Sequence, residues 1–242
     1  SLSHKLFLIN TFKMTQKFTI IFDLDGTLVD TAPDLMNAHN YVMKKFGFET
    51  KTSEDIKNLV GKGAKSLIGR SVWGQARKEL SKVNDEAIKK EMVTEFINYY
   101  SKNIANESKL VNGALEFLNW CKKNNISMGI CTNKQDYLAI DLLKKINVYD
   151  YFEYIAGSNT FDYCKPDPRH LTNVIEIMQG DIKKSLMIGD SETDSNTARS
   201  AKIPFILLED GYTEKKVTEI PHDHLIKDFI GIEKIISSYL NG

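Results

Sequence analysis

The 242-residue chain has few cysteines and no excess of charge of either sign. Its cysteines, Cys121, Cys131 and Cys164, are odd in number and lack the spacing of a metal site. We therefore expect free thiols in the reducing cytoplasm rather than a disulfide framework. Lys plus Arg and Asp plus Glu both number 32, so the overall charge indicates neither a nucleic acid nor an anionic membrane as partner. An anionic ligand would have to be bound by a local cluster of residues.

Long apolar segments are also missing. No stretch approaches the roughly 18 apolar residues that a membrane span needs. The short apolar segment 6–9 is broken by Asn10 and lacks a small-residue cleavage site, so it makes a poor signal peptide. We find no internal repeat and no low-complexity tract. With 42% hydrophobic and 26% charged residues, the composition is that of a folded globular protein of one large or two small domains.

Six short apolar segments, rich in β-branched and aromatic residues, have the composition of buried strands. They cover residues 19–22, 126–131, 154–156, 185–188, 205–208 and, most weakly, 224–226. Most are separated by helical patterns, at 113–123, 134–146, 169–178 and 193–201. This alternation predicts an α/β fold whose parallel sheet is covered by helices on both faces. Ligands of such sheets bind beyond the C-terminal ends of the strands.

One part of the chain interrupts the alternation. From about residue 34 to residue 109 the patterns are helical, over 35–46, 64–82 and 85–104. We therefore predict an all-helical subdomain, inserted after the first strand and lying over the same edge of the sheet. The predicted organisation is an N-terminal extension at 1–17, a core at 18–32 and 110–242, and the helical insertion at 33–109.

Four carboxylates follow two of the predicted strands. Asp23 and Asp25 come after the first strand, and alternate residues of an extended segment point the same way, so both can reach the crevice. Asp190 and Asp194 follow the fourth strand, one helical turn apart if a helix begins near Ser191. An Asp-rich turn or a helix N-cap at Asp190 explains part of this pattern, but not four carboxylates at one edge. Such an oxygen-rich cluster suits Mg²⁺.

Polar residues after two other segments could bind phosphate at the same edge. Thr132 and Asn133 follow the second strand and are predicted to open a helix, where a hydroxyl and main-chain N–H groups bind anions. An ordinary Thr N-cap accounts for them equally well. Lys165 precedes the rigid turn 166–168, which makes it a better candidate than most lysines for neutralising phosphate charge.

Taken together, these segments resemble the motif set of the haloacid dehalogenase superfamily. In chain order the motifs are Phe22 to Leu28, Thr132-Asn133, Lys165-Pro166 and Gly189 to Asp194. The resemblance runs from about residue 18 to residue 208. It implies a Rossmann-like core with a helical cap of the C1 type after the first motif. The chain between Thr132 and Lys165 is too short for the larger, second type of cap.

The resemblance implies a Mg²⁺-dependent phosphatase. Asp23 would attack phosphorus and form an aspartyl-phosphate, and Asp25 would protonate the leaving oxygen and then deprotonate water. Mg²⁺ would bind the carboxylates of Asp23 and Asp190 and the main-chain carbonyl of Asp25, and Asp194 would support the site through water or through Lys165. An acid at position 25 argues against dehalogenation.

The remaining motif residues would bind the transferred group. By the same resemblance, Thr132, Asn133 and Lys165 would bind the phosphate oxygens, on which charge is spread in the transition state.

The Gly-rich loop at residues 60–64 of the predicted cap resembles the cap loop of bacterial phosphoglycolate phosphatases, as do residues 28–35 and the turn 165–168. This implies hydrolysis of 2-phosphoglycolate to glycolate and phosphate. The residues that would meet the substrate from the cap are Gly61, Lys62, Gly63 and Arg70. A simple interhelical turn also accounts for the loop.

Two positions depart from this pattern. Lys62 stands where a small polar residue is common, and Lys202 stands where relatives usually end the helix of the fourth motif with glycine. We expect the first change to affect selectivity and the second to affect local structure.

Other functions stay open at this point. A sugar-phosphate mutase, a pyrophosphatase or a nucleotidase of the same superfamily would share the catalytic residues. A non-catalytic sensor on the same fold would be expected to lack Asp23 or Asp25, and both are present. In each case the expected partner is a small phosphorylated metabolite, and the sequence leaves the oligomeric state open.

Overall fold

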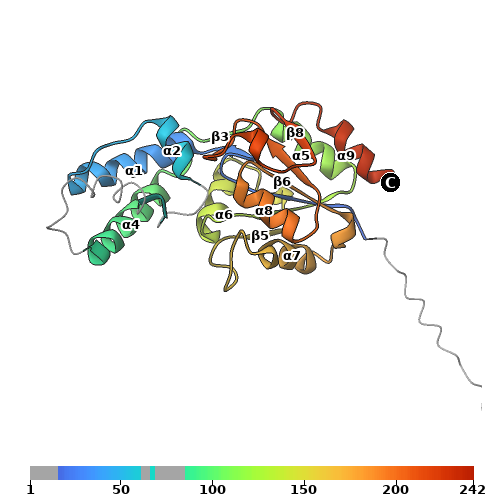
Figure 1. Ribbon diagram of the computed structural model, residues 1–242, viewed down its shortest axis with the longest axis horizontal. Coiled ribbons are helices and arrows are strands. Elements are labelled where there is room, and N and C mark those ends of the chain that lie inside the picture. The colour runs from blue at the N-terminus through green and yellow to red at the C-terminus, as the bar shows by residue number, and fades with distance from the viewer. Residues whose placement is uncertain (1–15, 61–65, 69–84) are drawn as a thin grey trace, which may run out of the picture.

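The structure is a computed structural model that describes residues 16–60, 66–68 and 85–242 (Figure 1). Its main sheet has six parallel strands in the order β5-β4-β1-β6-β7-β8. Their bounds are Thr19–Phe22 (β1), Ser127–Cys131 (β4), Tyr154–Ala156 (β5), Ser185–Gly189 (β6), Phe205–Leu208 (β7) and His224–Ile226 (β8). The six predicted strands and the α/β fold are thereby confirmed. β1 lies in the middle, with Thr19–Phe22 in register with Ser127–Ile130 and Ser185–Ile188.

Helices cover both faces of this sheet. They are α5 (Ala114–Lys123), α6 (Asp136–Lys145), α7 (Pro168–Ile177), α8 (Glu192–Ser200) and α9 (Glu233–Leu240), with short 3₁₀ turns at Tyr149–Tyr151, Ile182–Lys184 and Val217–Glu219. Side chains alternate between the faces along β1, because successive residues of a strand point to opposite sides. Ile20 and Phe22 pack in one buried cluster with residues of α5, α6 and α9, and Ile21 packs in another with residues of α7 and α8. The chain leaves β1 toward β4 and later toward β6, so the order reverses at β1, where α/β sheets bind ligands.

Between the first and second strands of the sheet the chain forms helices beside it (Figure 1). These are α1 (Ala32–Phe46), α2 (Ser53–Leu59) and α4 (Asp85–Lys102). α1 packs against α2 and α4, and its Leu35 and Val42 share a buried cluster with Met92 and Phe96 of α4. Most of the predicted helix 64–82 lies outside the described residues, although 66–68 are helical.

A small ribbon joins these helices to the sheet. β2 (Val29–Asp30) and β3 (Lys109–Leu110) pair antiparallel, so the two crossings of the chain lie side by side. This ribbon was not predicted, because two-residue strands carry no periodicity. It lies near the predicted boundaries of core and insertion, which stay a prediction.

One predicted helix start is wrong. α6 begins at Asp136 with Gln135 as N-cap, so Thr132 and Asn133 belong to the preceding loop and do not open the helix. Thr132 instead accepts a hydrogen bond from the main-chain N–H of Lys134 at 3.1 Å. Such local bonds to a hydroxyl favour turns over helix.

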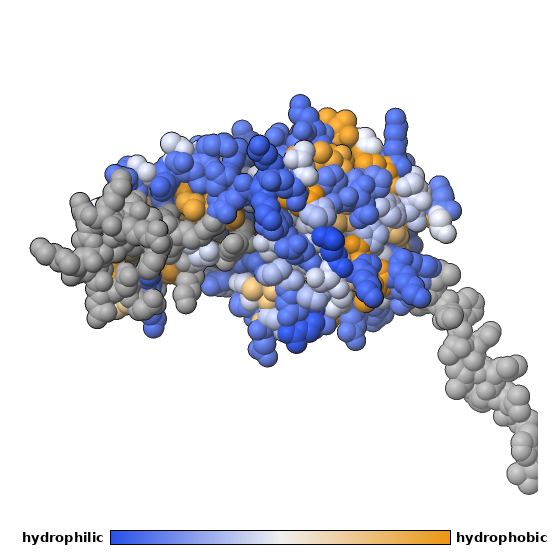
Figure 2. Space-filling model, in the orientation of Figure 1, coloured by the Kyte–Doolittle hydropathy of each residue, from blue (hydrophilic) through white to orange (hydrophobic). Residues whose placement is uncertain are grey.

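No helix of the described residues is long and apolar enough to cross a membrane. Among the residues coloured in Figure 2, hydrophilic ones predominate on the face shown, and the apolar ones form small separate areas.

Replacing Lys202 by glycine should stabilise the fold. Lys202 follows α8 with φ of 57°, a left-handed conformation that costs a residue with a side chain more than it costs glycine. Its N–H and that of Ile203 bind the carbonyls of Arg199 and Ala198, the pattern of a glycine-type helix end. We expect Lys202→Gly to raise the free energy of unfolding by about 1 kcal/mol in urea titrations. Lys202→Ala is the control, and an equal gain from it would contradict this explanation.

Candidate active site

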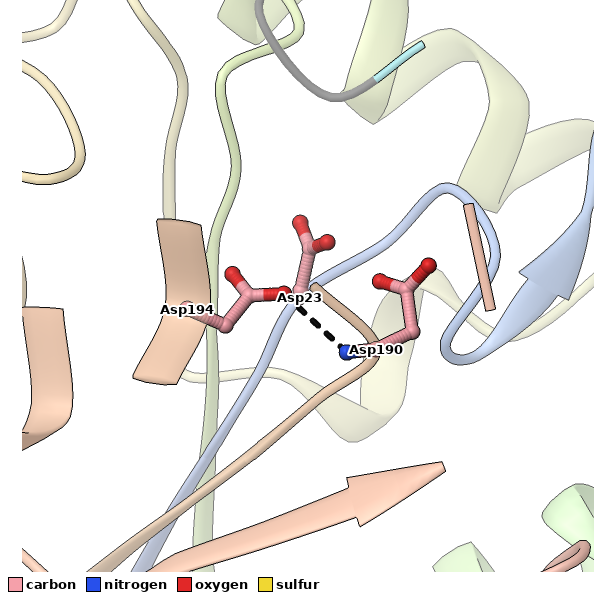
Figure 3. Close-up of side chains that lie close together, drawn as sticks. All are labelled: Asp23, Asp190 and Asp194. Carbon is pink, nitrogen blue, oxygen red and sulfur yellow. Dashed lines mark hydrogen bonds between the residues drawn. The ribbon is translucent and has the colours of Figure 1, made fainter. Parts of the chain in front are cut away.

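Three buried carboxylates meet at the C-terminal edge of the sheet (Figure 3). Asp23 follows β1, Asp190 follows β6 and Asp194 lies in the first turn of α8. One oxygen from each lies within 4.8 Å of the other two. The N–H of Asp23 donates to the carbonyl of Ile188 at 2.9 Å, which continues the pairing of β1 and β6 up to the site. Residues far apart in sequence thus form one acidic cluster.

Lys165 lies against this cluster. Its Nζ is 2.9 Å from an oxygen of Asp23 and 2.6 Å from an oxygen of Asp194, and its side chain is 2% exposed. Burial acts to lower the pKa of Lys165, but the carboxylates of Asp194 and Asp23 outweigh it and raise that pKa above its usual range. The lysine is therefore charged at neutral pH.

This one positive charge does not balance the carboxylates around it. Burial, and then the charge of Asp194, raise the pKa of Asp23 from 3.8 to about 6, although Lys165 acts in the opposite direction. Burial and the charges of Asp23 and Asp194 raise the pKa of Asp190 well above its usual range. Like charges held together out of water favour protonation or a bound cation. A divalent cation with oxygen ligands would fit this donor set.

Asp194 has less capacity for a metal than its neighbours. One of its oxygens accepts from Lys165, and the other accepts from the main-chain N–H groups of Asp190 and Ser191 and from the Ser191 hydroxyl. Ser191 and Asp194 form a capping box that begins α8. A Cβ at position 189 would lie 2.5 Å from the Asp194 side chain, so Gly189 provides the space for it. These contacts suit a residue that orients Lys165.

Asp190 is fixed by two donors. The Thr27 hydroxyl donates to one of its oxygens at 2.8 Å, and the main-chain N–H of Tyr212 donates to the other at 2.5 Å. Neither donor was predicted from the sequence. Thr27 belongs to the first motif and could have been found there, whereas nothing in the sequence around Tyr212 indicates its position.

Asp25 is held by one residue that directly precedes α1 and by one in the loop after β4. The Thr31 hydroxyl and Lys134 Nζ both donate to its Oδ1, at 2.6 and 2.8 Å. Lys134 also donates to the hydroxyl of Tyr100 in α4 at 2.8 Å. Burial acts to lower the pKa of Lys134, but Asp25 and Tyr100 raise it above its usual range. Neither Lys134, which directly follows Thr132-Asn133, nor Tyr100, which lies in the insertion, was predicted as a site residue.

A cavity of about 210 Å³ opens above Asp23 and Asp25. Thr132, Asn133 and Lys134 also line it. The apolar part of its lining comes largely from the helical insertion, with Leu35, Val60, Leu67, Val93, Phe96 and Ile97.

The sequence-predicted residues of the core therefore lie together. The side-chain amide of Asn133 donates to the main-chain carbonyl of Lys165 at 3.0 Å. This bond connects the loop after β4 to the loop that holds Lys165. The predicted substrate residues Gly61, Lys62, Gly63 and Arg70 lie outside the described residues.

The fold and these motifs place the chain in a known class: it belongs to the haloacid dehalogenase-like hydrolases, whose family model matches residues 20–208. The predicted family is thereby confirmed. Among curated proteins, it is 36% identical to a phosphoglycolate phosphatase of Agrobacterium fabrum over 90% of this chain and 93% of that one. It is 35% identical to a phosphoglycolate phosphatase of Mesorhizobium japonicum over 87% and 90%. A solved structure of a predicted phosphoglycolate phosphatase from Haemophilus somnus superposes with a TM-score of 0.85 at 28% identity, covering 92% of this chain and 99% of that one. The predicted likeness to phosphoglycolate phosphatases is confirmed as well.

Proposed function

We propose that this protein is a Mg²⁺-dependent phosphomonoester hydrolase that acts on a small phosphorylated metabolite through an aspartyl-phosphate at Asp23. The observation that carries the proposal is the buried cluster of Asp23, Asp190 and Asp194 beside Lys165. The relatives named phosphoglycolate phosphatase make 2-phosphoglycolate the substrate we propose.

In this proposal the carboxylates of Asp23 and Asp190 and the main-chain carbonyl of Asp25 would hold Mg²⁺. Bound there, it would neutralise charge where an anionic nucleophile approaches an anionic phosphate. Asp194 would support the site through Lys165, consistent with the four hydrogen bonds that its oxygens already accept. The raised pKa values of Asp23 and Asp190 support a cation at this position.

The first chemical step is an attack of an Asp23 carboxylate oxygen on phosphorus. A bond forms between that oxygen and phosphorus, the ester P–O bond breaks, and Asp25 gives its proton to the leaving oxygen. Thr31 and Lys134 both bind Oδ1 of Asp25, which leaves Oδ2 to carry the proton.

The second step hydrolyses the intermediate. Asp25, now a carboxylate, takes a proton from water as the water oxygen attacks phosphorus. The bond between phosphorus and Asp23 breaks, which releases phosphate and restores both carboxyl groups. The apolar part of the cavity lining would keep other water away from the intermediate.

Thr132 and Lys165 would bind the phosphate oxygens during both steps. Lys165 is charged and buried, so its attraction for an anion is not weakened by solvent. The Thr132 hydroxyl accepts the Lys134 N–H, which directs its own O–H toward another acceptor such as phosphate. Asn133 would act through the carbonyl of Lys165.

The substrate carboxylate would be bound from the cap. We assign this role to Lys62 and Arg70, with Gly61 and Gly63 giving access to the loop amides. Lys62→Ala and Arg70→Ala should each raise KM for 2-phosphoglycolate by about tenfold or more, because a charge-assisted hydrogen bond contributes about 1.5–3 kcal/mol. The matched measurement is KM for p-nitrophenyl phosphate, which has no carboxylate and should change by less than about twofold. An equal rise for both substrates would argue against the assignment.

Phosphate release from a panel of phosphomonoesters tests the proposed function. The panel comprises 2-phosphoglycolate, p-nitrophenyl phosphate, sugar phosphates and nucleotides, each assayed with Mg²⁺ and with EDTA. We expect Mg²⁺-dependent turnover with the highest kcat/KM on 2-phosphoglycolate. A higher kcat/KM on another compound would contradict 2-phosphoglycolate as the substrate. Absence of turnover on every compound would contradict the proposed function.

The stabilisation by Mg²⁺ should depend on pH. The folded pKa of Asp23 is raised from 3.8 to about 6, chiefly by burial. Between these values folded Asp23 keeps a proton that the unfolded chain has lost, so the metal-free protein loses stability as pH rises through this window. Mg²⁺ needs the ionised carboxylate, and should therefore raise the urea midpoint far more at about pH 7.5 than at about pH 5. An equal rise at both pH values would contradict the proposed ligand.

A further inference from the structure

Tyr212, in the loop after β7, contacts both the acidic cluster and the start of the helical insertion. Its main-chain N–H donates to Asp190 Oδ2 at 2.5 Å. Its hydroxyl accepts from the N–H groups of Thr31 and Ala32, both at 2.9 Å. The same hydroxyl donates to the carboxylate of Asp30. The Tyr212 side chain is therefore fully used as donor and acceptor.

The three residues bound by the hydroxyl form one of the two connections between the sheet and the helical insertion. Asp30 ends β2, Thr31 precedes α1 and Ala32 begins it. A cavity of about 440 Å³ lies at this place, between Lys57 of α2, the end of the β2–β3 ribbon and the loops after β7 and β8. Tyr212 lines that cavity and is 4% exposed. Its hydroxyl thus links core and insertion beside a region where they are not tightly packed.

Two glycines bring Tyr212 against the acidic cluster. A Cβ at position 26 would lie 2.4 Å from Asp190 Oδ2 and 2.7 Å from the Tyr212 ring. A Cβ at position 211 would lie 2.3 Å from the Asp190 side chain. Side chains at either position would push Tyr212 and Asp190 apart, so their close approach depends on both glycines.

We propose that Tyr212 is a positioning residue that couples cation binding at Asp190 to the hinge at residues 30–32. This rests on the proposed function, since it takes Asp190 as a Mg²⁺ ligand. The amide and the hydroxyl belong to one buried side chain and its own backbone, so a shift of Asp190 is passed to the hinge and a shift of the hinge is passed to Asp190. Coupling between two sites is reciprocal: if Mg²⁺ orders the hinge, fixing the hinge strengthens Mg²⁺ binding by the same factor.

Tyr212→Phe separates the two contacts, because it keeps the ring and the amide bound to Asp190 and removes the hydroxyl bound to the hinge. The probe is Mg²⁺ alone, without substrate. Its affinity is measured by calorimetry, and amide hydrogen exchange at Thr31 and Ala32 is measured by NMR with and without Mg²⁺. Tyr151→Phe is the control, since it also removes a tyrosine hydroxyl. That hydroxyl binds Asn119 of α5 and none of residues 30–32.

In the wild type we expect Mg²⁺ to slow exchange at both hinge amides. Tyr212→Phe should abolish that effect and weaken Mg²⁺ binding about fivefold or more, the range typical of coupled sites. Tyr151→Phe should resemble the wild type in both respects. A residue that only stabilises the hinge would change its exchange rate without changing Mg²⁺ affinity.

Equal Mg²⁺ affinity in the wild type and Tyr212→Phe would overturn the coupling. So would amide exchange rates at Thr31 and Ala32 of the wild type that do not change when Mg²⁺ is added. The second result needs no variant and holds even if Tyr212→Phe fails to fold. Mg²⁺ binding and coupling without phosphate release would overturn the proposed function alone. Phosphate release with unchanged Tyr212→Phe binding would overturn the coupling alone.

Discussion

Asp23→Asn is expected to abolish phosphate release, with kcat lowered on the order of 10⁴-fold or more, because the amide cannot act as the nucleophile. The substitution keeps the shape of the side chain and removes the negative charge of a buried carboxyl group. Burial raises the pKa of that group to about 6. The metal-free variant should therefore be no less stable in urea than the wild type at about pH 7.5. Loss of activity would then be a chemical effect and not a loss of fold.

Asp141→Asn is the control for this variant. Asp141 forms an exposed ion pair with Lys145 in α6, away from the acidic cluster, and should keep full activity. Activity of Asp23→Asn within about tenfold of the wild type would contradict the covalent mechanism.

Lys165→Met should affect both activity and stability. The variant leaves three buried carboxylates without the cation that binds two of them. Removing one partner of a buried ion pair costs about 3–5 kcal/mol, and we expect that loss in the free energy of unfolding with EDTA present. Mg²⁺ should restore part of it by supplying another positive charge. Turnover should fall by about 10³-fold, since the phosphate oxygens lose a charged donor.

The matched substitution is Lys145→Met. Lys145 pairs with Asp141 at 3.5 Å, but its side chain is 46% exposed, and pairs of this kind contribute about 1 kcal/mol or less. Its stability and turnover should stay close to those of the wild type. If the two variants lost similar stability, the buried cluster would not be the cause of the effect.

The sequence was sufficient for the sheet because its strands are apolar runs that end in polar turns. Thr19 to Phe22 and Ser185 to Ile188 are buried on both faces, and that pattern distinguishes a parallel sheet from other folds. The β2–β3 ribbon and the start of α6 were missed, since pairing across the chain and a local hydrogen bond to Thr132 decide them.

The site was predictable in its acidic residues and Lys165, because the acidic residues lie just after a strand or within one helical turn of its end, and Lys165 precedes a rigid turn. Tyr212 and Tyr100 could not be predicted in the same way. Tyr212 contacts Asp190 from a loop, and Tyr100, in the helical insertion, binds Lys134, which in turn binds Asp25. Short motifs carry no signal for such tertiary contacts.

The proposed aspartyl-phosphate can be detected directly at Asp23. The enzyme would be quenched with acid during turnover of 2-phosphoglycolate with Mg²⁺, treated with borohydride and digested for peptide mass spectrometry. Borohydride reduces an aspartyl-phosphate to homoserine and leaves a free carboxylate unchanged. We expect homoserine at position 23 only when substrate and Mg²⁺ are both present. Rapid phosphate release without homoserine at position 23, in the same quenched sample, would contradict it.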